Sequence, residues 1–299
     1  MTPPAAVRVP FSPGLRYAAA GALSFAFMTA LAKMAGSRIP IQEIILVRGL
    51  VFGGLTLLLL RRKGISPWGR ERPLLFLRGL LGYSALTCFL YAVMHLPLAD
   101  ITTLHFTNPV FGALLAAVVL GEVLRKAEAA LVLLSLVGVA MVARPEFLFG
   151  EGPALPPLAV GVALLGAVFT AGAYVLVRRL TRTNDPLVIV FYFAFLSVVG
   201  SIPFNVVGFV PPTAWEWLML LAMGVATLGG QVFLTQALRL EKAVRVMGVG
   251  YLQIVFAAVL GLSLFGEVPD MWSVAGAAVI IASTLLMARL RPVPAAAGR

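Results

Sequence analysis

The sequence predicts an all-α polytopic membrane protein in which ten transmembrane helices form two five-helix repeats of inverted topology. Three observations predict this fold: an apolar composition, ten separate apolar runs, and a second copy of the first half of the chain. Of the 299 residues, 61% are hydrophobic and 12% are charged, and the mean hydropathy is +1.00. An average soluble domain carries about 25% charged residues. The composition therefore excludes a soluble enzyme, tandem soluble domains and a disordered chain.

Ten apolar runs of about the 20 residues that a membrane-crossing helix needs follow one another along the chain. They cover residues 14–35, 42–60, 74–95, 99–120, 126–143, 157–178, 186–208, 214–238, 243–265 and 270–288. Prolines or charged residues fill each gap and end the helices. The first run is too long for the apolar core of a signal peptide, so we expect it to remain uncleaved. The predicted segments are a tail (1–13), a first repeat (14–145), a second repeat (157–290) and a tail (291–299).

The basic residues predict the orientation of the helices, because Lys and Arg are enriched in cytoplasmic loops. With the N-terminus in the cytoplasm, 18 Lys and Arg residues lie inside and only Lys33, Arg38 and Arg144 lie outside. The formal net charge of +11 is thus explained by topology, and we expect no nucleic-acid partner. Both termini are predicted to be cytoplasmic. The single cysteine, Cys88, allows no disulfide framework.

The last three spans of the two halves align without a gap at a shift of 145 residues. Residues 109–123 read PVFGALLAAVVLGEV and residues 254–268 read IVFAAVLGLSLFGEV, and the first spans match at a shift of 141. The shared Gly-Glu-Val is the specific part, because glutamate is rare at the end of an apolar run. Since each half holds five spans, the second half enters the membrane from the opposite side. Inverted repeats of this kind are typical of secondary transporters, which bind substrate near the midplane.

With two five-helix repeats whose fourth helices end in Gly121-Glu122 and Gly266-Glu267, the chain resembles the drug/metabolite transporter superfamily. It is most similar to the EamA-type ten-helix exporters, and more loosely to their aromatic amino-acid exporter branch. The resemblance implies a central cavity lined mainly by helices 3, 4, 8 and 9, with helices 5 and 10 peripheral. It also implies export of small metabolites from the cytoplasm of a bacterium across its inner membrane. Repeat two departs from the pattern, because Ile254 replaces the proline of repeat one, Pro109.

Polar residues on the fourth and ninth spans are the first candidates for the site, since polar groups at membrane depth face a partner or a wet cavity. Thr102, His105, Asn108 and Gly112 form one stripe, and Pro109 frees the carbonyl of His105. Asn108 aligns with Gln253 of the second repeat. The predicted substrate-binding residues are Tyr83, Thr87, His105, Asn108, Gln231, Tyr251 and Gln253. Pro109, Gly112, Gly248 and Gly250 are predicted to kink or gate the helices.

Four charged residues lie inside or at the ends of the predicted spans. Arg78 is expected to snorkel to the cytoplasmic interface. Arg48 lies deeper, and either has a structural partner or meets a substrate carboxylate. Glu122 and Glu267 are expected to cap helices at the interface. His105 is the best candidate for proton coupling, because acidic residues are nearly absent from the helix centres.

These patterns predict a transporter that exports a small metabolite by alternating access. The expected substrate is an amino acid with an aromatic or apolar side chain. The alternatives are a flippase for a lipid or amphiphilic precursor, a multidrug or toxic-compound exporter and, remotely, an intramembrane enzyme. No catalytic motif or metal-ligand spacing occurs, so we expect neither enzymatic activity nor a cofactor. The expected partners are a small-molecule substrate and the bilayer, with the chain a monomer or a weak homodimer.

Overall fold

Ten α-helices make up the part of the chain that the computed structural model describes, which comprises residues 12–36, 38–108, 110–112, 114–115, 126–143, 155–180, 182–240 and 249–289. The first repeat holds α1 (Pro13–Ala35), α2 (Ile41–Arg62), α3 (Arg72–His95), α4 (Leu98–His105) and α6 (Lys126–Ala143). The second holds α8 (Pro157–Leu180), α9 (Pro186–Gly208), α10 (Ala214–Leu240), α12 (Leu252–Phe265) and α13 (Met271–Arg289). The predicted all-α, ten-helix fold is confirmed.

Six of the described helices are long and apolar enough to cross a membrane: α1, α2, α3, α8, α9 and α10. Shorter apolar stretches of 10 to 17 residues lie in α6, α12 and α13. Prolines and polar caps set the helix starts. Pro13 and Pro186 occupy the first turns of α1 and α9, and the side chain of Asp185 accepts a hydrogen bond from the backbone N–H of Leu187 at 2.8 Å.

Eight helices form a closed ring in the order α1, α10, α2, α9, α3, α8, α4 and α12, each packed against the next and α12 against α1. The ring obeys the symmetry of the repeat. The α1–α10 contact has its mate in α8–α3, α10–α2 in α3–α9, and α12–α1 in α4–α8. The mates α2 and α9 contact each other directly, as do α4 and α12. The pseudo-two-fold axis therefore passes through these two pairs.

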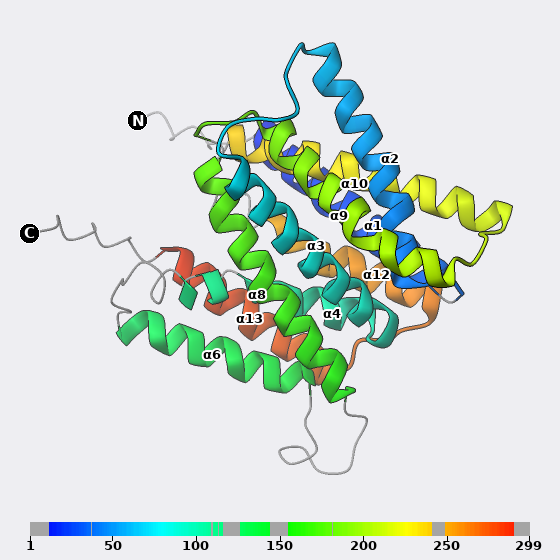
Figure 1. The fold of residues 1–299 in the computed structure, drawn as a ribbon. Coiled ribbons are helices and arrows are strands. Elements are labelled where there is room, and N and C mark those ends of the chain that lie inside the picture. The colour runs from blue at the N-terminus through cyan, green and yellow to red at the C-terminus, as the bar shows by residue number, and fades with distance from the viewer. Residues whose placement is uncertain are drawn as a thin grey trace, which may run out of the picture.

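Small residues allow these helices to approach closely, and their contacts show the inverted direction of the second repeat. Gly21 of α1 faces Gly230 and Leu234 of α10, while Ala18, earlier on α1, contacts Ala237, later on α10. The two helices are thus antiparallel. Helices α8 and α3 are antiparallel as well (Figure 1). Close backbone approach through small residues is the usual means of helix association in lipid.

The fifth helix of each repeat lies outside the ring, as the family resemblance implies. Helices α6 and α13 pack on each other at the edge of the bundle (Figure 1). Gly138 and Gly276 form this contact, since a Cβ atom on Gly138 would lie 2.8 Å from Ile280 and one on Gly276 would lie 2.7 Å from the Gly138 carbonyl oxygen. These two helices therefore brace the ring on one side without lining its interior.

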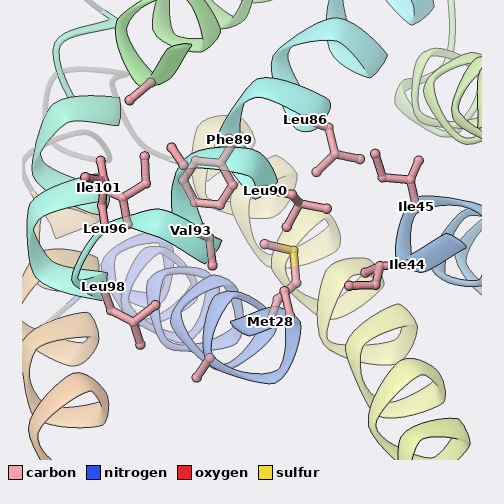
Figure 2. Close-up of a cluster of buried hydrophobic side chains, with 14 of the residues drawn as sticks. Met28, Ile44, Ile45, Leu86, Phe89, Leu90, Val93, Leu96, Leu98 and Ile101 are labelled. Atoms are coloured by element: carbon pink, nitrogen blue, oxygen red, sulfur yellow. The ribbon is translucent and has the colours of Figure 1, made fainter. Parts of the chain in front are cut away.

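The ring has two ends, which we name by residues. The Lys33 end is where α1 and α3 finish and α2 begins, and the Arg62 end is where α2 finishes and α1 and α3 begin. The largest hydrophobic cluster lies toward the Lys33 end and joins side chains of α1, α2, α3 and α4 across the ring (Figure 2). We call the members of this cluster that Figure 2 labels the plug: Met28, Ile44, Ile45, Leu86, Phe89, Leu90, Val93, Leu96, Leu98 and Ile101.

Candidate functional site

The fourth span is interrupted where the polar stripe was predicted. A continuous helix over 99–120 with a kink at Pro109 was expected, but α4 ends at His105 and the chain turns at Phe106 and Thr107. The interruption lies in the turn before the proline because a proline has no N–H to donate to the His105 carbonyl and its ring clashes with that carbonyl. Interrupted helices at membrane depth are typical of transporter binding sites.

Side chains donate hydrogen bonds to carbonyl oxygens at the interruption. Asn108 donates from Nδ2 to the carbonyl oxygen of His105 at 2.8 Å, and Thr107 donates from Oγ1 to that of Leu104 at 2.6 Å. The His105 carbonyl, expected to be free for a substrate, is therefore bonded to Asn108 in this structure. The His105 ring packs edge-on against Phe89, with 4.9 Å between ring centroids.

The second repeat has a matching turn, and the two turns meet at the pseudo-two-fold axis. Tyr251 lies in a turn directly before α12, at the position that aligns with Phe106 at a shift of 145. The two rings contact each other with centroids 5.0 Å apart. Gly250 lies beside them, since a Cβ atom there would be 3.9 Å from the Phe106 ring. The structure thus brings together His105, Asn108, Tyr251 and Gly250 at the α4–α12 side of the ring.

Other predicted site residues lie elsewhere. The Tyr83 hydroxyl lies 2.9 Å from Gln42 Oε1 and 2.9 Å from the Gly200 carbonyl oxygen, so it joins α3 to α2 and α9. Thr87 donates to the Tyr83 carbonyl oxygen of its own helix at 3.0 Å. It is half-buried and lies on the same side of α3 as the exposed residues Phe76 and Leu80.

The remaining predicted residues are either half-buried or lie in the undescribed part of the chain. Gln231 follows Thr227, a buried residue of α10, by one helical turn and is half-buried. Gln253 and Gly112 are also half-buried. Pro109 and Gly248 lie outside the described residues, as does Glu122.

A polar clasp closes the Lys33 end of the ring. Lys33 of α1 forms an ion pair with Glu267, which follows α12, and donates to the Leu96 carbonyl oxygen at 2.8 Å. The other carboxylate oxygen of Glu267 accepts the backbone N–H of Leu98 at 2.8 Å, at the start of α4. Gly266, with φ of 67°, turns the chain so that Glu267 faces these partners. The predicted helix-capping role of Glu267 is confirmed, and the clasp joins three helices.

A second ion pair lies at the same end of the ring. Arg38, in the loop before α2, pairs with Glu216 in the first turn of α10. The hydrogen bonds that Arg38 donates to Glu216 raise the pKa of Arg38 above its ordinary value. Both ion pairs join ring neighbours, but Lys33 also donates to the Leu96 carbonyl oxygen at the end of α3, across the ring. Among the described residues, the bonds that Arg38 donates reach only Glu216 and the Pro211 carbonyl oxygen, beside the start of α10.

The two ends of the ring differ in burial, although the repeat makes them equivalent in topology. Leu86 and Phe89 of the plug are 8% and 6% exposed, whereas their mates on α10, Gln231 and Leu234, are half-buried. Tyr174 lies on the face of α8 that buries Ala163, Ala167 and Thr170, yet it is 44% exposed. The interior is therefore closed at the Lys33 end and open near Tyr174, toward the Arg62 end.

The positions of two arginines in the ring interior were not predicted from the sequence. Arg78 was expected to snorkel to the interface, but it is 6% exposed and its guanidinium lies over the Phe193 ring of α9, 4.7 Å from the centroid. Arg48 is 1% exposed and lies over the same ring at 5.4 Å. Because Phe193 is far away in sequence, spacing along α3 gives no sign of this contact; only the rarity of arginine inside a span pointed to either residue.

The described residues contain no group of three or more His, Cys, Asp or Glu side chains that could hold a metal ion. A cavity of about 300 Å³ opens beside the clasp, between α4, α12 and α13. Its lining includes Asp100, Gly261, Glu267, Asp270 and Ser273.

Comparison with known proteins identifies a family whose sequence model matches each of the two repeats. The sequence model of the EamA-like transporter family matches twice, over residues 12–144 and 157–289. The chain is 37% identical to the pseudopaline exporter CntI of Pseudomonas aeruginosa over 279 residues, which cover 93% of this chain and 96% of the relative. It is 34% identical to the human solute carrier family 35 member G1 over 239 residues, which cover 76% of this chain and 65% of the relative. A solved crystal structure of a protein shares the fold with a TM-score of 0.60 at 20% identity, covering 90% of this chain and 96% of that one.

Proposed function

This chain belongs to the EamA-like transporter family, and on that premise we propose that it exports a small amino-acid-like metabolite by alternating access. It is a multi-pass membrane protein, and its relatives are transporters. The proposed location is a bacterial inner membrane, with both termini in the cytoplasm and the Lys33 end facing out. Transport, with no chemical change to the substrate, is the proposed activity.

The observation that carries alternating access is the difference between the two ends of a symmetric ring. The plug and the clasp close the Lys33 end, while Tyr174 on the interior face is 44% exposed toward the Arg62 end. Two topologically equivalent halves can exchange these conformations, which would close the Arg62 end and open the other. In the proposed orientation, the structure corresponds to a state that receives substrate from the cytoplasm.

The proposed substrate class rests on the polar groups at the interrupted helices. Asn108, Gln253 and His105 supply amide and imidazole groups for the polar end of an amino-acid-like molecule, and Phe106 and Tyr251 supply aromatic surface for an apolar side chain. The relative from Pseudomonas is an exporter of pseudopaline, which makes that compound a second substrate to test. A lipid flippase remains the alternative, since an amphiphile could enter the same ring laterally.

Uptake into liposomes containing the purified protein tests the proposal. We expect at least one of labelled L-phenylalanine, L-histidine and pseudopaline to exchange across the membrane faster than in protein-free liposomes, with and without a pH gradient. Failure to move any of the three, with fluorescent lipid crossing between leaflets instead, would favour the flippase. Formation of a product without translocation would revive the enzyme alternative.

The contribution of the interrupted helices can be separated from folding. Replacing Asn108 and Gln253 by Leu keeps similar volume and removes both amides. We expect at least a tenfold loss of exchange in protein that still gives the wild-type elution profile. Wild-type exchange in such protein would place the substrate elsewhere in the ring.

A further inference from the structure

Two arginines lie inside the ring with most of their hydrogen-bonding capacity unused. We propose that Arg48 and Arg78 bind the carboxylate of the transported substrate, an assignment that rests on the proposed function and makes it more specific. Arg48 is on α2 and Arg78 is on α3, and both helices are long and apolar enough to cross a membrane.

Their guanidinium groups are buried but only partly satisfied. Arg48 donates from Nη1 to Thr227 Oγ1 at 3.2 Å and contacts the sulfur of Met28 at 3.8 Å. Nε and Nη2 of Arg48, and Nε and Nη1 of Arg78, have no hydrogen-bond partner among the described residues. Unpaired charges at this depth are costly, and in membrane proteins they mark substrate or ion pathways. The guanidinium fork fits a carboxylate with two parallel hydrogen bonds.

The chain supplies no carboxylate of its own to these arginines in the part that the structure describes. Neither forms an ion pair there. Glu43, five residues before Arg48 on α2, instead accepts the backbone N–H of Val210 with Oε2 at 2.9 Å. A purely structural arginine would be expected to have a fixed anionic partner. Reversible binding of a substrate carboxylate explains why no acidic residue of the described chain pairs with these arginines.

The two arginines flank one ring at successive depths. Arg78 lies six residues from the start of α3, about 9 Å from the Arg62 end at 1.5 Å per residue, and Arg48 lies seven residues from the start of α2, about 10 Å from the Lys33 end. Phe193 lies beneath both guanidinium groups. A carboxylate bound to Arg78 could therefore pass to Arg48 as the ring changes state.

The open part of the interior leads to the first of these arginines. Tyr174 is exposed on the interior face of α8 and is close enough to Arg78 to interact with it electrostatically. Gly82, one turn after Arg78, leaves room for the guanidinium, because a Cβ there would lie 2.6 Å from Arg78 Nη1 and 2.7 Å from the Phe193 ring. A substrate arriving from the Arg62 end meets Arg78 before Arg48.

The carboxylate site can be tested on the wild-type protein by comparing two compounds. Liposomes containing the full chain are offered labelled L-phenylalanine or L-phenylalaninamide, which differ only in the carboxylate, together with pseudopaline. We expect phenylalanine to exchange at least about tenfold faster than its amide, the effect of losing a charge-assisted hydrogen bond. Equal exchange of acid and amide would overturn the carboxylate site and leave the proposed function standing. Exchange of none of the compounds would overturn both.

Variants separate binding from structure. In Arg48→Gln and Arg78→Gln we expect the half-saturating concentration to rise about tenfold or more, while the thermal midpoint stays equal or rises because an unpaired buried charge is gone. Arg48→Lys keeps the charge but loses the two-pronged guanidinium group, so its half-saturating concentration should lie between those of the wild type and Arg48→Gln. Arg179→Gln, an exposed arginine that pairs with Glu71 at 3.6 Å, is the control and should transport normally. A lower thermal midpoint together with an unchanged half-saturating concentration would assign the arginines a structural role and overturn the proposal. Loss of folding in both Gln variants would do the same.

Discussion

The clasp predicts that Glu267→Gln opens the Lys33 end. The substitution keeps the shape of the side chain but removes the charge that binds Lys33, while an amide oxygen can still accept from Leu98 N–H. The side chains of Lys33 and Glu267 are 16% and 19% exposed, between the surface pairs that contribute up to about 1 kcal/mol and the buried pairs whose breakage costs about 3–5 kcal/mol. We take about 1.5 kcal/mol as the free energy of interaction that the closed state loses, which corresponds to about a tenfold shift toward the open state.

Labelling of a cysteine behind the clasp measures this shift. Ala32, one residue before Lys33, is fully buried, and Cys88 is the single cysteine of the chain. In Cys88→Ala, Ala32→Cys protein in nanodiscs, where both faces are accessible, we expect Glu267→Gln to raise the rate of maleimide labelling about tenfold. Rapid labelling requires opening, so its rate follows the open population.

The second ion pair provides a matched control. Glu216→Gln removes the partner of Arg38 at the same end of the ring, but Arg38, unlike Lys33, donates no hydrogen bond across the ring among the described residues. We expect less than a twofold change in labelling. Equal rates in the Glu267→Gln variant and its parent, or equal increases in both variants, would refute the reasoning that the clasp holds this end closed.

Two further predictions concern contacts away from the proposed substrate path. Gly138→Leu should lower the thermal midpoint, because a Cβ there would already meet Ile280 at 2.8 Å, yet transport per folded molecule should be unchanged since α6 and α13 lie outside the ring. A loss of transport in folded Gly138→Leu protein would contradict that peripheral role. Tyr83→Phe should cost about 1 kcal/mol of stability through the lost hydrogen bond to Gln42 or Gly200, measured by thermal unfolding. A raised half-saturating concentration at wild-type stability would instead return Tyr83 to the substrate site.

The sequence was sufficient for the fold because its main signals are local or repeated. Length and hydropathy locate each span, and the shift of 145 residues relates α3 to α10 and α4 to α12 before any contact is known. The same shift pairs Phe106 with Tyr251, whose rings then meet at the axis. Repeat symmetry therefore carries information about distant contacts that the pattern of a single helix lacks.

The site was less predictable because it depends on side-chain direction and on distant partners. A stripe of Thr102, His105 and Asn108 looks the same on a kinked helix as on an interrupted one, so the turn at Phe106 was missed. Arg78 lies near a helix end, where snorkelling is the ordinary outcome, and only the neighbouring α9 explains why it turns inward over Phe193. The partner of Glu267 was hidden for the same reason, since Lys33 is 234 residues away.

A reversible lock across the closed end tests the alternating-access account most directly. The sulfur of Met94, on α3, occupies the place that a Cβ on Gly36, at the end of α1, would take, and α1 and α3 meet there across the ring. In Cys88→Ala protein with cysteines introduced at Gly36 and Met94, we predict that oxidation abolishes exchange of the compound that the wild type moves fastest, and that reduction restores it. Undiminished exchange by protein whose disulfide has fully formed would contradict the account.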